Sequence, residues 1–488
     1  MSEYKTFIQR IGLIGLVNIL VSLSSLILLP ILTKNLSINE YGIWIQIITT
    51  INLVSALAIL GLPYAMIRFL SSTDDKEKIK EEFYSINFLL IIISLVFLVI
   101  MLLFSNIITK FLLDGDYKTG FIIPFIIFVV CLNALTLNYF RTFNQMKKYA
   151  LFLFLQAYLN IIMVSYFIIT GHGVFGASIG YLITQISLFL ITTILIFKDI
   201  GFKIPHFKNV RKYLSFGIPT IPWNLSSWIV DSSDRYVIGI LLGTSSVGYY
   251  SPGYSLGIII QMFAVPFSTI LLPTLSMKYD KNENIVTLLK YSHKYFLLMA
   301  IPAVIGMSLL SKNILSILTT PEIALNGYLV TPFIALSALL FGSYSILNNI
   351  IILKNKTKLI GSIWIIVAFI NLFLNIMVVP YFGILGAAAI TLISYLIAFL
   401  ITVYYCLKFF KFEFDYDFIV KSILASLIMS IPIFKLNPNG LLEIIVTILI
   451  SVIVYMVTLY SIKGIDKKEV KFLKNLFQKE NGNKTGDK

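Results

Sequence analysis

Three charged side chains lie within a stretch that is otherwise rich in apolar residues. Asn224, Ser227, Asp231, Asp234 and Arg235 follow one another at i, i+3, i+7, i+10 and i+11, so a helix would carry them on one face. Charges that face lipid are costly, and we expect this face to turn toward the protein interior. Its arginine can bind an anionic substrate, and its acids can bind a coupling ion. The alternative is a structural ion pair between Asp231 and Arg235 at i, i+4.

Other polar and aromatic side chains are candidates for the same site. Pro219 and Pro222 bend the start of this helix, and bent helices at membrane depth are tolerated where they line a cavity. Gln46 belongs to a polar stripe on an earlier segment, and Arg68 is either at the mouth of the cavity or an ordinary basic anchor. Two aromatic residues can stack on sugar faces or belong to the interfacial aromatic belt. The candidate substrate-binding residues are Arg235, Arg68, Asn224, Trp228, Tyr254 and Gln46, and the candidate ion-coupling residues are Asp231 and Asp234.

The sequence offers no catalytic or metal-binding constellation. The three histidines are far apart, and the two cysteines lie in apolar stretches where buried free thiols are expected. We therefore expect no metal and no cofactor. The chain also lacks the Gly-rich loop with Lys and Ser/Thr that holds nucleotide phosphates. The outward loops are short for a membrane glycosyltransferase, so we expect no enzymatic activity.

The elements that position these residues are membrane helices. Hydrophobic residues make up 58% of the 488-residue chain and charged residues 12%, whereas soluble domains contain about 25% charged residues. Residues 149–197 and 359–407 are two runs of 49 residues without Asp, Glu, Lys or Arg. A spanning helix needs about 20 apolar residues, so each run holds two spans. The first apolar run, 11–33, has no small-residue cleavage site after it and is interpreted as a retained span.

The two uncharged runs also reveal an internal repeat. Asn144 and Asn355 are 211 positions apart, and Gly173 and Gly383 are 210 apart. Further matched pairs are Lys147/Lys358, Asn160/Asn371, Lys198/Lys408 and, at an offset of 206, Gly42/Gly248. Duplicated membrane bundles are typical of transporters that handle their substrate between the two halves.

We predict an all-α polytopic membrane protein with about fourteen transmembrane helices. Two pseudo-symmetric six-helix lobes, 1–197 and 198–410, are followed by two additional helices within 411–463 and a basic cytoplasmic tail, 464–488. The tail has apolar residues at helical spacing among lysines and is expected to lie on the inner leaflet. The predicted spans are 11–32, 42–67, 83–107, 120–140, 150–170, 174–197, 214–240, 247–272, 293–311, 328–353, 359–379, 383–406, 417–435 and 441–462.

The distribution of basic residues predicts the orientation in the cell membrane. With the N-terminus inside, 32 of the 38 Lys and Arg residues fall on the cytoplasmic side and 6 on the other. Both termini are therefore predicted to be cytoplasmic. Anionic lipid at the inner leaflet accounts for the net charge of +15, so no nucleic acid partner is expected.

Several motifs, in their order and spacing, resemble one family. The most specific stretch is Ser215-Phe-Gly-Ile-Pro219 through Asp234-Arg235-Tyr236 and Val247-Gly-Tyr-Tyr-Ser251; supporting pieces are Glu40-Tyr41-Gly42, Arg141…Asn144…Lys147 and Gly383…Gly386-Ala387. With these motifs, the chain resembles the polysaccharide flippases, also called O-antigen or oligosaccharide translocases. They share a superfamily with multidrug-and-toxin extruders and lipid II flippases.

The resemblance implies a flippase that carries a polyprenyl-(pyro)phosphate-linked oligosaccharide to the outer leaflet by alternating access. It makes Arg235 and Arg68 the candidates for phosphate contact. Lipid II flippases have several arginines in their first spans, and none precedes Arg68 in the first two spans here. This difference argues against lipid II as the substrate.

The same resemblance leaves two alternatives and a set of partners. One alternative is a multidrug or cation antiporter of the superfamily, although most first-lobe spans lack an interior acid. The other is a membrane enzyme of glycan assembly, either a polymerase or a glycosyltransferase. The implied partners are the lipid-linked oligosaccharide, membrane lipid, and a glycan polymerase or glycosyltransferases that act in the same assembly.

Overall fold

The protein is built from helices throughout the part that the structure describes. The computed structural model describes residues 2–71, 73, 75–281, 284–410 and 414–464, and no strand occurs in these ranges. The tail predicted at 464–488 lies outside the described residues except for its first residue. The N-terminal helices are α1 (Ser2–Asn35), α2 (Ile38–Ala58), α3 (Leu62–Leu70), α4 (Lys76–Leu103), α5 (Ser105–Leu112), α6 (Tyr117–Thr142), α7 (Met146–Ile169), α8 (Gly173–Ile200) and α9 (Val210–Gly217).

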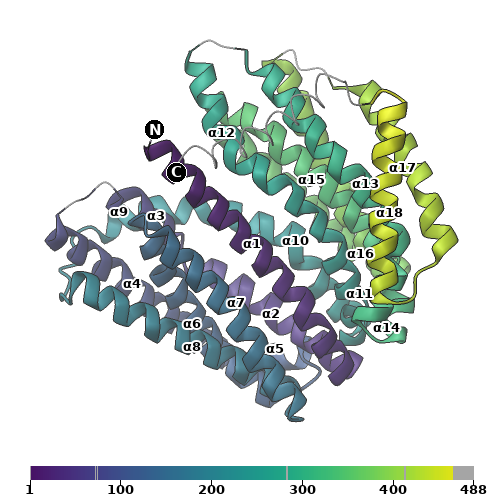
Figure 1. Ribbon diagram of the computed structural model, residues 1–488. Helices are drawn as coiled ribbons and strands as arrows, with labels where there is room; N and C mark the ends of the chain where they lie inside the picture. Colours follow the sequence, from purple (N-terminus) through teal and green to yellow (C-terminus); the bar gives the residue numbers. More distant parts are fainter. Residues whose placement is uncertain (1, 72, 74, 282–283, 411–413, 465–488) are drawn as a thin grey trace, which may run out of the picture.

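A second series of helices follows, and two short 3-10 segments interrupt it. These elements are η1 (Ile218–Thr220), α10 (Ile221–Leu242), α11 (Thr244–Gly257), η2 (Ile258–Ala264), α12 (Val265–Asp280), α13 (Val286–Leu318), α14 (Pro321–Gly327), α15 (Val330–Leu353), α16 (Thr357–Phe409), α17 (Tyr416–Leu436) and α18 (Leu441–Ser461). In Figure 1 the purple-to-blue helices gather on one side of α1, and the green and yellow helices gather on the other.

Most of the predicted membrane spans coincide with helices. Twelve helices in the described ranges are long and apolar enough to cross a membrane. One of them, α16, contains two predicted spans, because its backbone turns at Gly383 (φ 59°). The charged helix α10 is a further segment of 22 residues. These observations agree with about fourteen transmembrane segments.

Several predicted spans have different boundaries in the structure. The span at 214–240 begins in α9 and crosses η1 before α10. The span at 42–67 is not one helix, because Leu60 and Gly61 adopt positive φ (46° and 66°) between α2 and α3. The span at 83–107 ends at Leu103, and the short α5 follows it. The span at 247–272 is divided by η2, in a region where prolines remove helical hydrogen-bond donors. The span at 293–311 belongs to the 33-residue α13.

The backbone repeats the sequence duplication at two turns. Asn144 and Asn355 end corresponding helices with φ of 56° and 54°, and Gly173 and Gly383 have φ of 57° and 59°. Glycine enters this left-handed region without steric cost, and asparagine is one of the few other residues that tolerate it. The matched residues therefore perform the same structural task in each copy.

The helices form two packed groups. Buried apolar residues between 28 and 213 make one continuous core, and the cores of the remaining helices draw on residues 230–459. We call α1–α9 the first group and η1–α18 the second group. The helices α17 and α18 lie at the edge of the second group and pack on α13 (Figure 1).

The two groups touch where α2 crosses α11. A Cβ on Gly42 would overlap the backbone oxygen of Thr244, and a Cβ on Gly248 would overlap that of Ile38. Gly42 and Gly248 are matched by the repeat, and so are Ile38 and Thr244, at the same offset. The crossing is thus a pseudo-symmetric contact between two backbones, and only glycine permits it.

Polar contacts reinforce this end of the bundle. The ammonium group of Lys34, at the end of α1, donates a 2.8 Å hydrogen bond to the carbonyl of Ile317 at the end of α13. The hydroxyl of Thr33 lies 3.2 Å from the carbonyl of Leu318. We call these contacts and the glycine crossing the seam. The seam joins the two groups at the end of α10 that carries Leu242.

Candidate functional site

The charged face predicted in the sequence forms on α10. Pro222 occupies the first turn of this helix, where a missing N–H costs nothing, and η1 supplies the bend before it. Asp234 is 1% exposed, and the side chain of Arg235 is 12% exposed. Such charges require partners within the protein.

Arg235 is held in place by residues that belong, like Arg235 itself, to the second group of helices. Its Nη1 lies 3.0 Å from Asp234 Oδ1 and donates a 2.8 Å hydrogen bond to the backbone carbonyl of Asp231. Its guanidinium lies over the ring of Tyr254, 4.1 Å from the centroid. The hydroxyl of Tyr250 donates to the other oxygen of Asp234. The charge of Arg235 is therefore balanced inside the protein.

The carboxylate of Asp231 has different partners from those expected. It accepts hydrogen bonds from the hydroxyl of Tyr395, on α16, and from Ser227 at 3.2 Å. The i, i+4 ion pair suggested by the sequence is thus replaced by a pair between Arg235 and its direct neighbour Asp234, and Asp231 offers Arg235 its backbone carbonyl.

Two side chains of α2 reach α10 across the boundary between the groups. Gln46 Nε2 donates a 2.7 Å hydrogen bond to the carbonyl of Arg235, and Gln46 itself is fully buried. The hydroxyl of Tyr236 donates to Thr50 Oγ1 at 2.7 Å. These bonds fix the register of α10 against α2 between the seam and the opposite end of α10.

A polar cavity of about 460 Å³ lies between the two groups, at the end of α10 away from the seam. Both groups contribute to its walls. The first group provides Tyr64, Asn138 and Arg141 among its polar and aromatic lining residues, and the second provides Trp223, Asn224, Ser227, Trp228, Asp231 and Ser232. Tyr64, Arg141 and Trp223 are exposed, whereas the indole N–H of Trp228 is buried and has no hydrogen-bond partner among the described residues. A ligand acceptor would satisfy that donor.

The structure separates the sequence-predicted site residues into three sets. Those that line the cavity are Asn224, Trp228 and Asp231. Those that build the support behind it are Gln46, Asp234, Arg235 and Tyr254. Arg68 belongs to neither set: it is an exposed residue of α3 and does not line the cavity.

Several lining residues were not among the sequence candidates, and the two from α6 are the most informative. Arg141 and Asn138 lie one turn apart near the end of α6. Their spacing places them on one helix face, but the sequence does not show that this face meets α10. The sequence did show an arginine at the end of an apolar helix, within the motif Arg141…Asn144…Lys147. The same arginine is also what a basic residue at the cytoplasmic end of a membrane span would look like.

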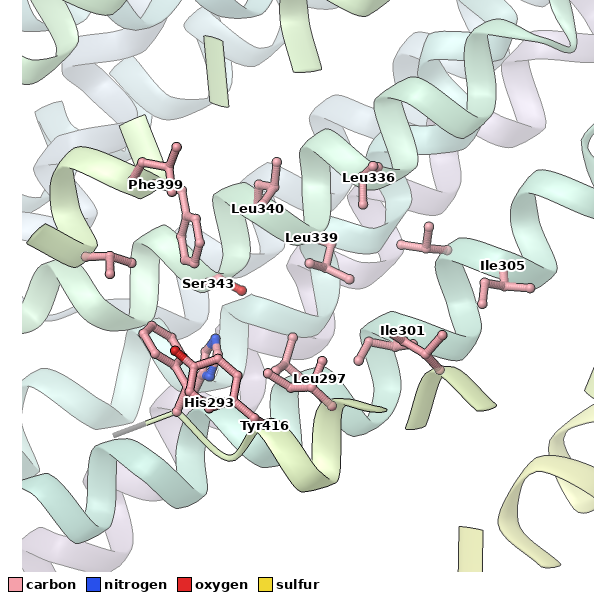
Figure 2. A pocket seen from close by; sticks show the side chains of 16 residues that line it. His293, Leu297, Ile301, Ile305, Leu336, Leu339, Leu340, Ser343, Phe399 and Tyr416 are labelled. Atoms are coloured by element: carbon pink, nitrogen blue, oxygen red, sulfur yellow. The ribbon is translucent and has the colours of Figure 1, made fainter. Parts of the chain in front are cut away.

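A larger hollow, of about 590 Å³, is apolar and lies elsewhere. It is bounded by α13, α15, α16 and α17, and Figure 2 shows Leu297, Ile301 and Leu339 along it, with His293 and Tyr416 at one end. It shares no lining residue with the polar cavity. Its lining suits hydrocarbon rather than a hydroxyl-rich or charged group. Within the described ranges, no cluster of three or more His, Cys, Asp or Glu side chains could hold a metal ion.

Comparison with known sequences identifies relatives among glycan flippases. The family model described as "Polysaccharide biosynthesis protein" matches residues 7–279. The probable low-salt glycan biosynthesis flippase Agl15 of Haloferax volcanii is 26% identical over 259 residues, which cover 52% of this chain and 55% of Agl15. The chain thus spans about half the length of that relative. The uncharacterized membrane protein MJ1068 of Methanocaldococcus jannaschii is 21% identical over 88% of this chain and 90% of its own.

Solved structures share the fold. The lipid II flippase MurJ in an inward closed conformation superposes with a TM-score of 0.76 at 20% identity, covering 91% of this chain and 97% of that one. An inward-facing multidrug resistance MATE family transporter gives a TM-score of 0.64 at 16% identity, with 80% and 93% covered. The family model matches more than half of the length of this chain. This multi-pass membrane protein therefore belongs to the polysaccharide biosynthesis protein family.

Proposed function

We propose that this protein is a flippase for a polyprenyl-(pyro)phosphate-linked oligosaccharide. The observation that carries the proposal is the polar cavity between the two groups of helices, with Arg141 and two tryptophans in its walls. A phosphate bearing sugars cannot cross hydrocarbon unaided, and this cavity offers it hydrogen bonds, a cation and aromatic faces. The prenyl tail can remain in the bilayer.

The size of the cavity supports a short headgroup. Pockets of about 300–1,000 Å³ enclose ligands of drug size, and the cavity falls in this range at about 460 Å³. It suits a phosphate with one or a few sugars rather than a finished polymer. Longer glycans would have to extend out of the cavity during transport.

The position of the seam supports alternating access. The groups touch at the seam, and the cavity lies at the opposite end of α10. Separation of the groups at the seam, together with closure around Tyr64, Arg141 and Trp223, would turn the cavity to the other leaflet. The motion is a rocking of one helical group against the other, as in transporters built from repeats.

The charge distribution supports the orientation of this proposal, and the relatives named as glycan flippases support its partners. With 32 of 38 basic residues on one side, the cavity end and both termini face the cytoplasm. The substrate then enters from the cytoplasmic leaflet, where glycosyltransferases complete it, and a polymerase or transferase uses it on the other side. The protein itself moves the lipid without catalysis.

A cation antiporter is the competing function, because Asp231 lines the cavity and the fold is shared with multidrug transporters. Purified protein in liposomes, supplied with a fluorescent polyprenyl-linked oligosaccharide, separates the two functions. A flippase moves the lipid to the opposite leaflet, and the Trp228→Ala variant moves it more slowly. Efflux of organic cations without any lipid movement would refute the flippase.

A further inference from the structure

We propose that the glycan is carried on a single phosphate rather than on a pyrophosphate. This inference rests on the proposed flippase function and adds the chemistry of the carrier. It comes from the charges that face the cavity, because a glycosyl phosphodiester carries one negative charge and a glycosyl pyrophosphate carries two.

Two charged side chains line the polar cavity, and they have opposite signs. Arg141 lies near the end of α6, and Asp231 lies deeper, on α10. The nearby Arg235 is paired with Asp234 and covered by Tyr254, so it adds no free positive charge. The described lining residues therefore include one basic and one acidic side chain, and they offer no second cation.

Arg141 is available for one phosphate. It is exposed, and it forms no ion pair with any described residue. A guanidinium presents parallel N–H donors that match two oxygens of one phosphate. A single guanidinium in this arrangement neutralises the one negative charge of a phosphodiester.

Asp231 opposes a second phosphate. Tyr395 and Ser227 donate hydrogen bonds to its carboxylate and hold it in place. The remaining lone pairs can accept sugar hydroxyls but repel an anion. The second phosphate of a pyrophosphate would thus enter the cavity without a cation of its own and with a carboxylate near it. Two like charges about 10 Å apart, at an effective dielectric constant of about 20, weaken binding about tenfold.

The test compares one glycan on two carriers. Proteoliposomes are loaded with the same fluorescent oligosaccharide on polyprenyl phosphate or on polyprenyl pyrophosphate, and the rate of appearance in the opposite leaflet is measured. We expect about tenfold faster transport of the phosphate-linked lipid at low substrate concentration. Equal rates, or faster transport of the pyrophosphate-linked lipid, would overturn the inference and leave the flippase function standing. Transport of neither lipid would refute both.

Variants assign the preference to the two charges. Asp231→Asn removes the charge and keeps one oxygen that can accept from the hydroxyl of Tyr395, while its amide N–H can donate to the hydroxyl of Ser227. The preference should shrink mainly because the pyrophosphate-linked lipid moves faster. Arg141→Gln should slow both lipids. Lys147→Gln is the matched control: it removes an exposed basic residue six positions away that does not line the cavity, and it should change neither rate. A preference that persists unchanged in Asp231→Asn would contradict the role given to Asp231.

Discussion

Replacement of Arg235 by alanine should destabilise the protein rather than remove a substrate contact. The change leaves the carboxylate of Asp234 buried at 1% exposure without its cation, and it removes the 2.8 Å bond to the carbonyl of Asp231. Breaking a buried ion pair costs about 3–5 kcal/mol. The cation–π contact with Tyr254 adds about 0.5–2 kcal/mol. We expect the free energy of unfolding to fall by about 3–5 kcal/mol, since the site relaxes in part.

The partner of Arg235 determines which second change restores stability. Arg235→Met combined with Asp234→Asn removes both charges and keeps an acceptor for the hydroxyl of Tyr250, so it should recover most of the loss. Arg235→Ala combined with Asp231→Ala should not, because Asp234 remains a buried unpaired acid. Lys147→Ala, an exposed control, should stay within about 0.5 kcal/mol of the wild type.

Equilibrium unfolding of the purified protein in mixed micelles measures these differences, and flipping in liposomes is recorded in parallel. One result would refute the reasoning: Arg235→Ala that unfolds like the wild type but no longer transports. Arg235 would then act on the substrate, and its pairing with Asp234 would contribute little to the fold.

Three further predictions concern the seam, the contact behind the cavity and the topology. Gly42→Val introduces a Cβ where the backbone oxygen of Thr244 lies, so it should force the two groups of helices apart at the seam. A cysteine placed in the seam should then react faster with a thiol reagent, and unchanged reactivity would contradict the glycine crossing. Gln46→Leu loses the bond to the carbonyl of Arg235 and should cost about 1 kcal/mol in the same unfolding assay, whereas a gain in stability would contradict that bond. Lys208 lies on the predicted cytoplasmic side of the membrane and Asn439 on the opposite side. In intact cells Lys208→Cys should therefore resist an impermeant maleimide, whereas Asn439→Cys should react with it. The reverse pattern would invert the predicted orientation.

Much of the fold can be predicted from the sequence, because membrane helices and the turns between them have characteristic local residue patterns. Long uncharged runs define helices, and the turn residues Asn144 and Gly173 recur with their counterparts in left-handed geometry. The break at Leu60 was missed because leucine gives no sign of positive φ, although Gly61 and a following proline mark the same place. Helix spacing placed the polar residues of α10 on one face correctly.

The partners within the site could not be predicted in the same way. The sequence suggested Asp231 for Arg235 because residues four apart are neighbours on a helix. The actual arrangement depends on tyrosines from other helices, since Tyr395 occupies the carboxylate of Asp231 and Tyr250 braces that of Asp234. Arg141 was missed for a related reason: its place in the cavity depends on where α6 lies relative to α10 across that cavity. Contacts between distant helices leave no periodic trace in one sequence.

The glycine crossing carries information about ancestry. Gly42 meets Thr244, Gly248 meets Ile38, and the repeat relates each residue of one contact to a residue of the other. A surface that binds its own duplicate in this reciprocal way is the geometry of a two-fold homodimer interface. A single ancestral half, present as two separate chains, would have made the same crossing with a second copy of itself. Arg141 in one half and Asp231 in the other have no matching residue at the repeat offset, so the two halves share this interface and differ in the polar residues of the cavity.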